Sequence, residues 1–208
     1  MEVRRGMKQK EEKEKEEMPQ WGEPSCCGGD EGDIRKVGNH IYYYAPVTSK
    51  NVVTLIDGLH TLANDQQIDS IEHGGSPPAI VLHINSGGGS IYSGIAAMEA
   101  VRRCPVPIHA IVDGVCASAA TFPLMVAEKR IMNMNSYMLI HQLSNWTFGK
   151  FSELQDEMKN NEEFMRLIKK IYLKHTKIPE GKLDKILKHD LWFDSAKCLK
   201  YGMIDEIV

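Results

Sequence analysis

Two turns of small residues follow apolar, strand-like segments of this sequence, and each could build a chemical site. The first turn, at 85–90, holds three consecutive glycines after the apolar run at 79–84. The second, at 114–117, follows the run at 107–112. Glycines let a backbone approach a ligand closely, so the first turn could hold a phosphate or an oxyanion, or could simply join a strand to a helix. It is not a P-loop, because no Gly-Lys-Ser/Thr sequence follows the glycines.

Ser118 is the candidate nucleophile, directly after the second turn. Small residues flank it, so a substrate carbonyl would have room beside its hydroxyl. The N–H of Ala119 would point toward the negative charge that develops during acyl transfer. The same serine could instead cap the helix that we expect at 118–128, which is a common use of serine. Residue type alone does not separate these two roles.

A general base and an orienting carboxylate are available further along the chain. His141 follows the apolar segment at 137–140, and Asp190 precedes the apolar residues 191–193 and could be partly buried. A buried carboxylate needs a partner, and an imidazole N–H would serve. Both residues could equally be structural, and spacing does not bring the serine, the histidine and the carboxylate together. The competing candidates are His83, His109, His175 and His189 for the base and Asp194 for the carboxylate.

The elements that would position these residues alternate between strands and helices, which predicts an α/β fold with a largely parallel sheet. Apolar residues recur every three, four or seven positions through 151–175, and charges fill the other side, as in an amphipathic helix. Asp194 and Gly202 are expected to cap the two ends of the last helix. We expect strands at 41–44, 79–84, 107–112, 130–134 and 137–140, helices at 51–63, 92–102, 118–128, 151–175, 183–187 and 195–201, and a loop at 69–78.

Length and composition indicate one globular domain with a charged extension. The chain has 208 residues, of which 42% are hydrophobic and 25% are charged, and its net charge is −3. Residues 1–32 are too polar to offset the entropy of ordering, so we expect a disordered tail at 1–32 and a folded domain at 33–208. The net charge gives no reason to expect a nucleic-acid partner. No apolar run is long enough to span a membrane.

The cysteines and the N-terminus predict a cytoplasmic location. The five cysteines are odd in number, irregularly spaced and without paired CxxC motifs, which predicts neither a disulfide framework nor a zinc site. The vicinal pair Cys26-Cys27 is interpreted as a bystander. Free thiols fit a reducing compartment, and the charged N-terminus is not followed by the apolar stretch of a secretory signal.

Taken together, these motifs resemble those of the Clp protease proteolytic-subunit family. They occur in the family's order and close to its spacing, and the resemblance covers roughly residue 34 to the end of the chain. No single motif is specific, but the combination is. The matching stretches are 84–89, 114–120 around the serine, 138–142 with its histidine-glutamine pair, His175-Thr176, and 190–205.

The resemblance implies a crotonase-like αβ-superhelix with a projecting "handle" helix at 151–175. It implies that Ser118 is the nucleophile of a serine peptidase, that His141 is its general base and that Asp190 orients the histidine. Backbone N–H groups of Gly88 or Gly89 and of Ala119 would form the oxyanion hole. The reaction would be acyl transfer with neither a metal nor an organic cofactor in this subunit.

The resemblance also implies an assembly. Family members form two heptamers stacked face to face, a tetradecamer, with the active sites enclosed and the handle helix in the ring-to-ring contact. A separate AAA+ unfoldase, which uses ATP, usually feeds polypeptide substrates into the chamber. For this chain we therefore expect self-association, an unfoldase partner and unfolded polypeptides or peptides as substrates.

Several positions depart from the family pattern and mark this chain as a divergent member. Gly87 replaces a proline, Ala119 replaces a methionine but keeps its N–H, and Pro123 should kink or shift the helix that contains it. The segment 65–78 is longer than usual. The loop after His141-Gln142 lacks its usual prolines and glycines, Lys177 replaces a glycine, and the tail at 1–32 does not resemble the family's axial loop. A viral or mobile-element origin would fit these changes.

Four other functions remain open at this point. A phage-type capsid-maturation protease could share the fold and the serine, and a non-catalytic ring subunit could share the fold alone. Another crotonase-fold enzyme could use the glycine turn on an acyl-CoA thioester, but it would not need Ser118, His141 and Asp190 together. A thiol enzyme could use Cys116, two residues before the serine.

Overall fold

One eight-stranded sheet organises the part of the chain that the computed structural model describes, residues 33–208. The tail expected at 1–32, with its two cysteines, lies outside the described residues. The main path of the sheet runs β1-β2-β3-β4-β5-β8, with β6 beside the end of β4 and β7 beside β6. The strands are β1 Asp33–Val37, β2 His40–Tyr44, β3 Ile80–Ser86, β4 Ile108–Ala117, β5 Lys129–Met132, β6 Tyr137–Leu139, β7 Phe193–Asp194 and β8 Glu206–Ile207.

The sheet is largely parallel, as the sequence predicts. Neighbouring strands from β2 to β5, and the pairs β4/β6 and β5/β8, are parallel, whereas β1/β2 and β6/β7 are antiparallel. Side chains alternate along each strand between the two faces. In β3, for example, Ile80, Leu82 and Ile84 are buried and the residues between them are half-buried. The buried face lies under the helices and forms the hydrophobic core.

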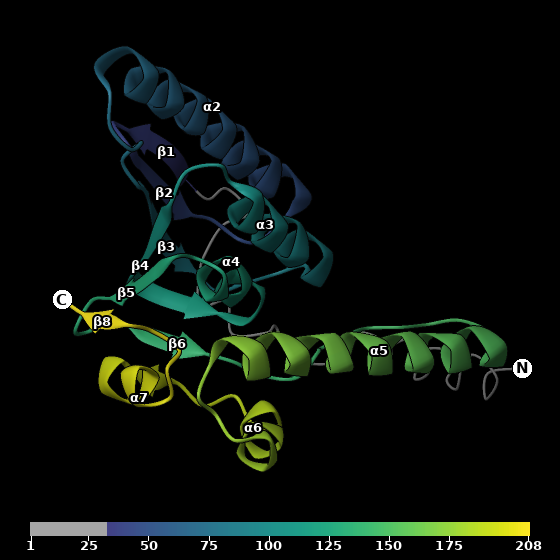
Figure 1. Ribbon diagram of the computed structural model, residues 1–208. Helices are drawn as coiled ribbons and strands as arrows, with labels where there is room; N and C mark the ends of the chain where they lie inside the picture. The colour runs from purple at the N-terminus through teal and green to yellow at the C-terminus, as the bar shows by residue number, and fades with distance from the viewer. Residues whose placement is uncertain (1–32) are drawn as a thin grey trace, which may run out of the picture.

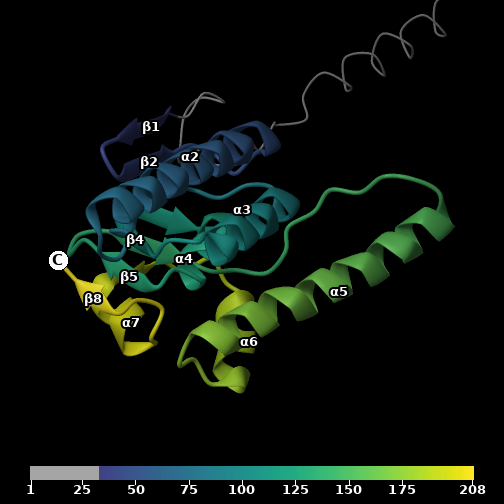
Figure 2. The same ribbon diagram turned by 45° about the horizontal axis from the view of Figure 1, so that its top comes forward.

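Helices α2 and α3 cover that core face, and α5 projects far from the body of the molecule (Figures 1 and 2). Only the C-terminal part of α5 is packed, since its buried residues are Ile168, Ile171 and Tyr172. None of the helices within 33–208 has the length and apolar character needed to cross a bilayer. The helices are α2 Ser49–His73, α3 Ile91–Arg103, α4 Thr121–Met125, α5 Phe151–His175, α6 Glu180–Leu187 and α7 Ser195–Lys200.

The long helix at 151–175 is confirmed at both ends, and so are the caps of α7. Asp194 accepts a hydrogen bond from the N–H of Lys197, and Gly202, just beyond the helix, has a φ of 62°. The loop expected at 69–78 is wrong in part, because α2 continues to His73. Residues 69–73 contain no glycine or proline, and the helix ends only at Gly74, where φ is 76°.

The turn expected at 114–117 is wrong, and the helix expected at 118–128 is wrong in part. Strand β4 continues through Ala117, because the end of β4 gains a second partner in β6. A single 3-10 turn, Ser118–Ala120, then leads into the short helix α4. Pro123 therefore lies in the first turn of α4, where the first N–H groups have no partner within the helix.

Candidate active site

Ser118 lies at the point where β4 ends and the chain turns sharply. Its φ is 54°, and it is the one non-glycine residue with a positive φ within 33–208. Holding a non-glycine residue in this region costs about 1–3 kcal/mol and is most often found at functional sites. Its side chain caps no helix, since the residue before the 3-10 turn is Ala117 and no side-chain cap is present. The capping alternative for Ser118 is therefore wrong.

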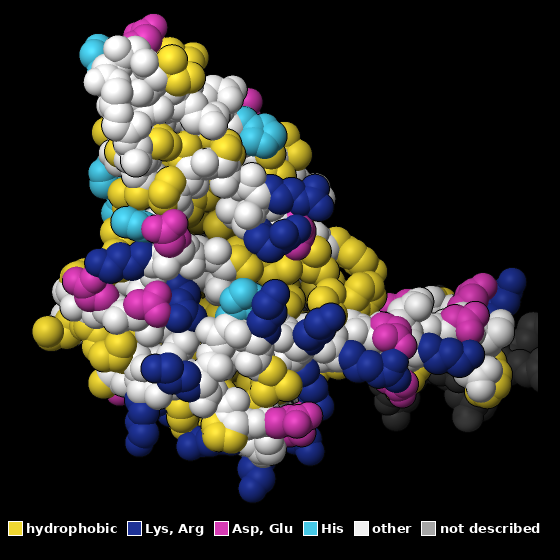
Figure 3. All heavy atoms as spheres, in the orientation of Figure 1, with side chains coloured by type: hydrophobic (Ala, Val, Ile, Leu, Met, Phe, Trp, Pro, Cys, Tyr) yellow, Lys and Arg dark blue, Asp and Glu magenta, His cyan; other side chains and the backbone are white. Residues whose placement is uncertain are grey.

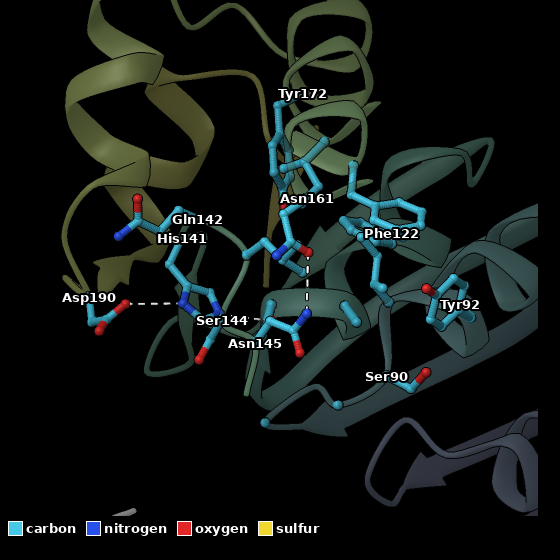
Figure 4. A pocket seen from close by; sticks show the side chains of 18 of the residues that line it. Ser90, Tyr92, Phe122, His141, Gln142, Ser144, Asn145, Asn161, Tyr172 and Asp190 are labelled. Atoms are coloured by element: carbon cyan, nitrogen blue, oxygen red, sulfur yellow. Dashed lines mark hydrogen bonds and ion pairs between the residues drawn. The ribbon is translucent and has the colours of Figure 1, made fainter. Parts of the chain in front are cut away.

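The structure brings Ser118, His141 and Asp190 together. The Nε2 atom of His141 lies 2.8 Å from Oγ of Ser118, and its Nδ1 atom lies 3.1 Å from Oδ1 of Asp190. Figure 4 shows Asp190 and the imidazole ring of His141 pointing toward each other. One ring nitrogen thus faces the hydroxyl and the other faces the carboxylate, which is the arrangement of a serine–histidine–carboxylate triad.

Strand pairing explains how residues distant in sequence meet here. The register of β4 and β6 pairs Ala117 with Leu139, so the chain beyond each strand emerges on the same side. His141 comes two residues after Leu139 and reaches the serine that follows Ala117. The N–H of the next residue, Gln142, donates to the carbonyl of Leu187 at 2.6 Å, which ties the histidine segment to the end of α6. Asp190 follows α6 closely and is positioned by the same contact.

We expected Asp190 to be partly buried, but its side chain is exposed. Of its side chain, 77% is accessible, against 23% for His141. It lies in the connection between α6 and β7, and the apolar Leu191 and Trp192 that follow it are exposed as well. The apolar residues beside Asp190 in the sequence are therefore not packed over it, which is why the burial prediction failed.

The glycine turn after β3 is held firmly against residues 45–47, the segment that follows β2. The hydroxyl of Ser86 donates to the carbonyl of Ala45 at 2.7 Å and accepts the N–H of Gly88 at 3.2 Å. The N–H of Val47 donates to the carbonyl of Gly88, and the N–H of Ser90 donates to the carbonyl of Val47, each at 2.8 Å. These bonds leave the N–H of Gly89 without a partner within 33–208.

Glycine is required at the point where this turn meets the nucleophile. A Cβ atom at Gly88, where φ is 98°, would lie 2.7 Å from Cβ of Ser118 and 3.2 Å from the nitrogen of Ala119. A Cβ atom at Gly89, where φ is 147°, would lie 2.5 Å from the carbonyl oxygen of Val47. The two turns therefore approach each other at backbone distance, and the N–H groups of Gly89 and Ala119 come to border the same space.

A pocket of about 750 Å³ opens over Ser118 and extends along α5. Aromatic and aliphatic side chains line it together with polar ones, several of which Figure 4 labels. Among the polar residues, Nδ2 of Asn145 donates to Glu157 at 2.5 Å and to Asn161 at 3.3 Å. Such a cleft can hold an extended peptide with an apolar side chain beside the serine. The apolar lining includes Tyr92, Phe122, Phe164, Ile168 and Tyr172.

The competing nucleophile and base candidates lie elsewhere. Cys116 has no exposed surface, and burial raises the pKa of its thiol well above the usual range, so a reactive thiolate there is disfavoured. His83 pairs with Asp113 at 2.9 Å, but that pair lies on the half-buried positions of the strands, away from the helix-covered face. Within 33–208, no group of three or more His, Cys, Asp and Glu side chains has the arrangement of a metal site.

Sequence reasoning missed the residues that hold the two turns in place. Ser86 and Asn85 looked like part of a glycine-rich loop, yet Oδ1 of Asn85 accepts the N–H of Val115 at 3.0 Å and so ties the end of β3 to β4. The polar pair between a buried strand and three glycines was the available signal, since such residues are rarely left without a backbone partner.

Comparison with known proteins agrees with this geometry. A family model described as Clp protease matches residues 38–208. An ATP-dependent Clp protease proteolytic subunit of Deinococcus radiodurans is 31% identical over 131 residues, which are 62% of this chain and 64% of that protein. Proteolytic subunit 1 of Streptomyces avermitilis is 31% identical over 62% of this chain and 60% of its own length. Proteolytic subunit 2 of Treponema denticola is 32% identical, with shares of 62% and 65%.

The aligned region spans less than two thirds of each of these relatives, whereas the family model covers most of the chain and nearly all of the described residues. The resemblance inferred from the motifs is thereby confirmed, and so is the α/β fold class with its crotonase-like arrangement of sheet and helices. This chain belongs to the Clp protease family, a family of serine-type endopeptidases.

Proposed function

We propose that this chain is a serine endopeptidase in which Ser118 is the nucleophile, His141 the general base and Asp190 the residue that orients the histidine. The observation that carries the proposal is the distance of 2.8 Å between Nε2 of His141 and Oγ of a serine held at a φ of 54°. A strained serine at the end of a strand, bonded to an imidazole and opening into a pocket, has no evident structural purpose.

The proposed reaction proceeds by acyl transfer. His141 takes the proton of Ser118 as Oγ attacks the peptide carbonyl, and it then delivers that proton to the leaving amine. Asp190 accepts the Nδ1–H of His141, which fixes the tautomer and stabilises the imidazolium that forms. A water molecule, deprotonated by the same histidine, later attacks the acyl-enzyme and releases the second product. The proton transfers in these steps use only side chains of this chain and water.

The oxyanion hole is assigned to the N–H groups of Gly89 and Ala119. Gly88 was an equal candidate in the sequence, but its N–H is engaged by Ser86, and Gly88 does not line the pocket. Gly89 and Ala119 both line it, and neither N–H is used elsewhere within 33–208. Two preorganised N–H donors on one side of the nucleophile are what a tetrahedral intermediate needs.

Assembly into a ring with a partner ATPase is also proposed. The relatives are named as subunits of ATP-dependent proteases, which supports both self-association and a separate ATP-using unfoldase. The described part of this chain offers a surface for it, because Phe151, Leu154 and Met158 form an exposed apolar stripe on the projecting part of α5. Stacked heptamers with the sites facing an inner chamber would cover this stripe, and unfolded polypeptides would be the substrates.

Labelling with a fluorophosphonate probe tests the proposed nucleophile without knowledge of the natural substrate. The full-length chain, in its assembled form, is incubated with the probe beside Ser118→Ala and His141→Ala, and the intact mass is measured. We expect one adduct on the parent, none on Ser118→Ala, and labelling at least about a hundredfold slower on His141→Ala, because the base is lost.

Two matched variants control for general damage. Ser70→Ala removes an exposed serine of α2, and His83→Gln removes the histidine of the other histidine–aspartate pair. Both should label as fast as the parent. No adduct on the assembled parent, or an adduct that persists on Ser118→Ala, would overturn the proposal; the first result would favour a non-catalytic ring subunit.

A further inference from the structure

A buried chain of hydrogen bonds connects α5 to the backbone of the nucleophile. The hydroxyl of Thr121 donates to the carbonyl oxygen of Ser118 at 2.7 Å, and its Oγ1 atom lies 2.7 Å from the hydroxyl of Tyr172. Thr121 has no exposed surface and Tyr172 has 1%. Tyr172 comes from the packed end of α5, and its ring borders the pocket beside Phe122 (Figure 4).

The direction of the chain follows from its protons. A threonine hydroxyl has one proton, and here that proton is given to the carbonyl of Ser118, so Oγ1 can only accept from Tyr172. Burial raises the pKa of Tyr172 well above its usual range, so the phenol keeps its proton and remains a donor. The sequence of donors is therefore Tyr172 to Thr121 to the carbonyl of Ser118.

The carbonyl that receives this chain belongs to the same peptide group as the N–H of Ala119. The backbone N–H of Thr121 donates to this oxygen as well, so the carbonyl end of the peptide is held by two donors. Hydrogen bonds to a carbonyl polarise the whole amide and strengthen its N–H as a donor. They also fix the plane of the peptide, and hence the direction in which the N–H of Ala119 points.

We propose that Thr121 and Tyr172 are positioning residues that orient and polarise the Ser118–Ala119 peptide, so that its N–H binds the oxyanion more strongly. The inference rests on the proposed function, because it assigns a role in the same oxyanion hole. It also gives the packed end of α5 a role at the nucleophile, because Tyr172 acts on the Ser118–Ala119 peptide through Thr121. Two buried hydroxyls could pair merely to satisfy each other, but these two extend to the nucleophile's own carbonyl.

The experiment removes the hydroxyls one at a time from the full-length, assembled protein. Tyr172→Phe keeps the ring and removes the first donor, Thr121→Val removes the second at nearly constant volume, and Thr121→Ser keeps a hydroxyl at that position. Tyr44→Phe is the matched control, because it also loses a tyrosine hydroxyl bond, to Asp113, on the opposite face of the sheet. The readouts are kcat and KM for a fluorogenic peptide, the rate of fluorophosphonate labelling, and the affinity for a peptide boronic acid.

A role in oxyanion binding changes the tetrahedral species and leaves substrate binding alone. We expect kcat, labelling rate and boronate affinity to fall about 3- to 10-fold in Tyr172→Phe and about 10- to 50-fold in Thr121→Val, with KM within about twofold of the parent; loss of an entire oxyanion donor costs about 100- to 1,000-fold. Thr121→Ser and Tyr44→Phe should stay within about twofold of the parent. The double variant Thr121→Val, Tyr172→Phe should be no slower than Thr121→Val, because the two residues act in series.

Each contrary result has its own meaning. Parent-like kcat, labelling and boronate affinity in both Tyr172→Phe and Thr121→Val would overturn this inference while leaving the proposed peptidase intact. A rise in KM with unchanged kcat would overturn it too, since it would assign the pair to substrate binding. An unlabelled parent would overturn the proposed function, and this inference with it.

Discussion

Nδ1 of His141 lies 3.1 Å from Oδ1 of Asp190, although most of the Asp190 side chain is in contact with solvent. Water competes for an exposed carboxylate and screens its charge, so this pair is weaker than the same pair in a protein interior. The hydrogen bond can still select the tautomer in which Nε2 faces Ser118. In the single chain, Asp190 should therefore contribute mainly by orienting the imidazole ring of His141, and less through its charge.

Asp190→Asn should lower kcat by only about 10- to 100-fold, whereas amidation of a buried triad aspartate costs about 10,000-fold. The asparagine can still form a hydrogen bond with the imidazole ring of His141. If its NH₂ group faces Nδ1, however, it favours the tautomer in which Nε2 carries the proton and cannot accept one from Ser118. The measurement is kcat for a fluorogenic peptide at several salt concentrations, with Asp113→Asn as the control in the other histidine–aspartate pair. A loss near 10,000-fold would contradict the prediction and would mean that assembly buries this carboxylate.

Gly88→Ala should abolish fluorophosphonate labelling even if the protein still folds. The added Cβ would lie 2.7 Å from Cβ of Ser118 and 2.7 Å from the carbonyl oxygen of Ala117, and the φ of 98° is itself unfavourable for alanine. Gly181→Ala is the control, since nothing lies within 4 Å of its added Cβ and the residue is in α6. That variant should label normally and gain about 0.5–1 kcal/mol in free energy of unfolding. Normal labelling of Gly88→Ala would show that the turn is looser than the structure indicates.

The sequence predicted regular elements well where the pattern was local, and failed where tertiary contacts decide. The helical period of the apolar residues at 151–175 predicts both ends of α5, and the uninterrupted apolar run at 79–84 predicts β3. Nothing local shows that β4 continues through Ala117, because that depends on pairing with β6, twenty residues further along. Short strands such as β7 and β8 exist only through their partners, and the sequence gives them no period to detect.

The residues of the candidate site also fall into those that sequence motifs predict and those that only tertiary contacts reveal. Ser118, His141 and Asp190 could be named from the combined motifs, but their meeting depends on strand register and on the bond between Gln142 and Leu187. Thr121 and Tyr172 carried no signal, because a threonine near a helix start and a tyrosine on an apolar helix face are ordinary. A hydrogen bond between residues 51 positions apart is visible only once the chain is folded.

Cys116→Ala should leave fluorophosphonate labelling within about twofold of the parent, since the thiol is buried and does not line the pocket. Because removal of a buried sulfur leaves a small void, the free energy of unfolding should fall by about 1 kcal/mol. Intact-mass analysis after treatment of the native parent with iodoacetamide should show no carbamidomethyl group on Cys116. Loss of labelling in Cys116→Ala together with rapid alkylation would revive the thiol alternative.

Asp205→Asn should make the free energy of unfolding depend less on pH in the acid range. Arg130 donates to this carboxylate from its side chain and from its backbone N–H, which lowers the pKa of Asp205 below its ordinary value of 3.8. The unfolded state then binds the proton first as pH falls, so the stabilisation is present above about pH 4 and is lost as pH falls through the lowered pKa. Because the side chain is 41% exposed, the effect should be about 1 kcal/mol or less.

Urea unfolding of the parent and of Asp205→Asn between pH 2.5 and pH 6 measures this difference, with pH values chosen to bracket the ordinary carboxyl pKa. The two curves should converge at the acid end and separate at pH 6, with the parent more stable. Asp156→Asn, which removes an exposed ion pair with Lys159, is the control and should parallel the parent. A constant difference between parent and Asp205→Asn at all pH values would contradict the assignment to this carboxylate.

Replacement of the exposed apolar stripe of α5 should separate the proposed rings without harming the fold. Phe151, Leu154 and Met158 continue the helix face that carries Ile168 and Tyr172, which are buried against the body, yet the first three stay exposed. Charged side chains gather on the side of the projecting helix that Figure 3 shows. Such a stripe on a projecting helix needs a cover, and the family resemblance makes a second ring the occupant. If the parent sediments as the proposed tetradecamer of about fourteen subunits, the double variant Phe151→Ser, Met158→Ser should therefore sediment as about seven subunits. Ile71→Ser, an equally exposed apolar residue near the end of α2, is the control and should leave the mass unchanged. An unchanged mass in the double variant would mean that α5 does not join the rings.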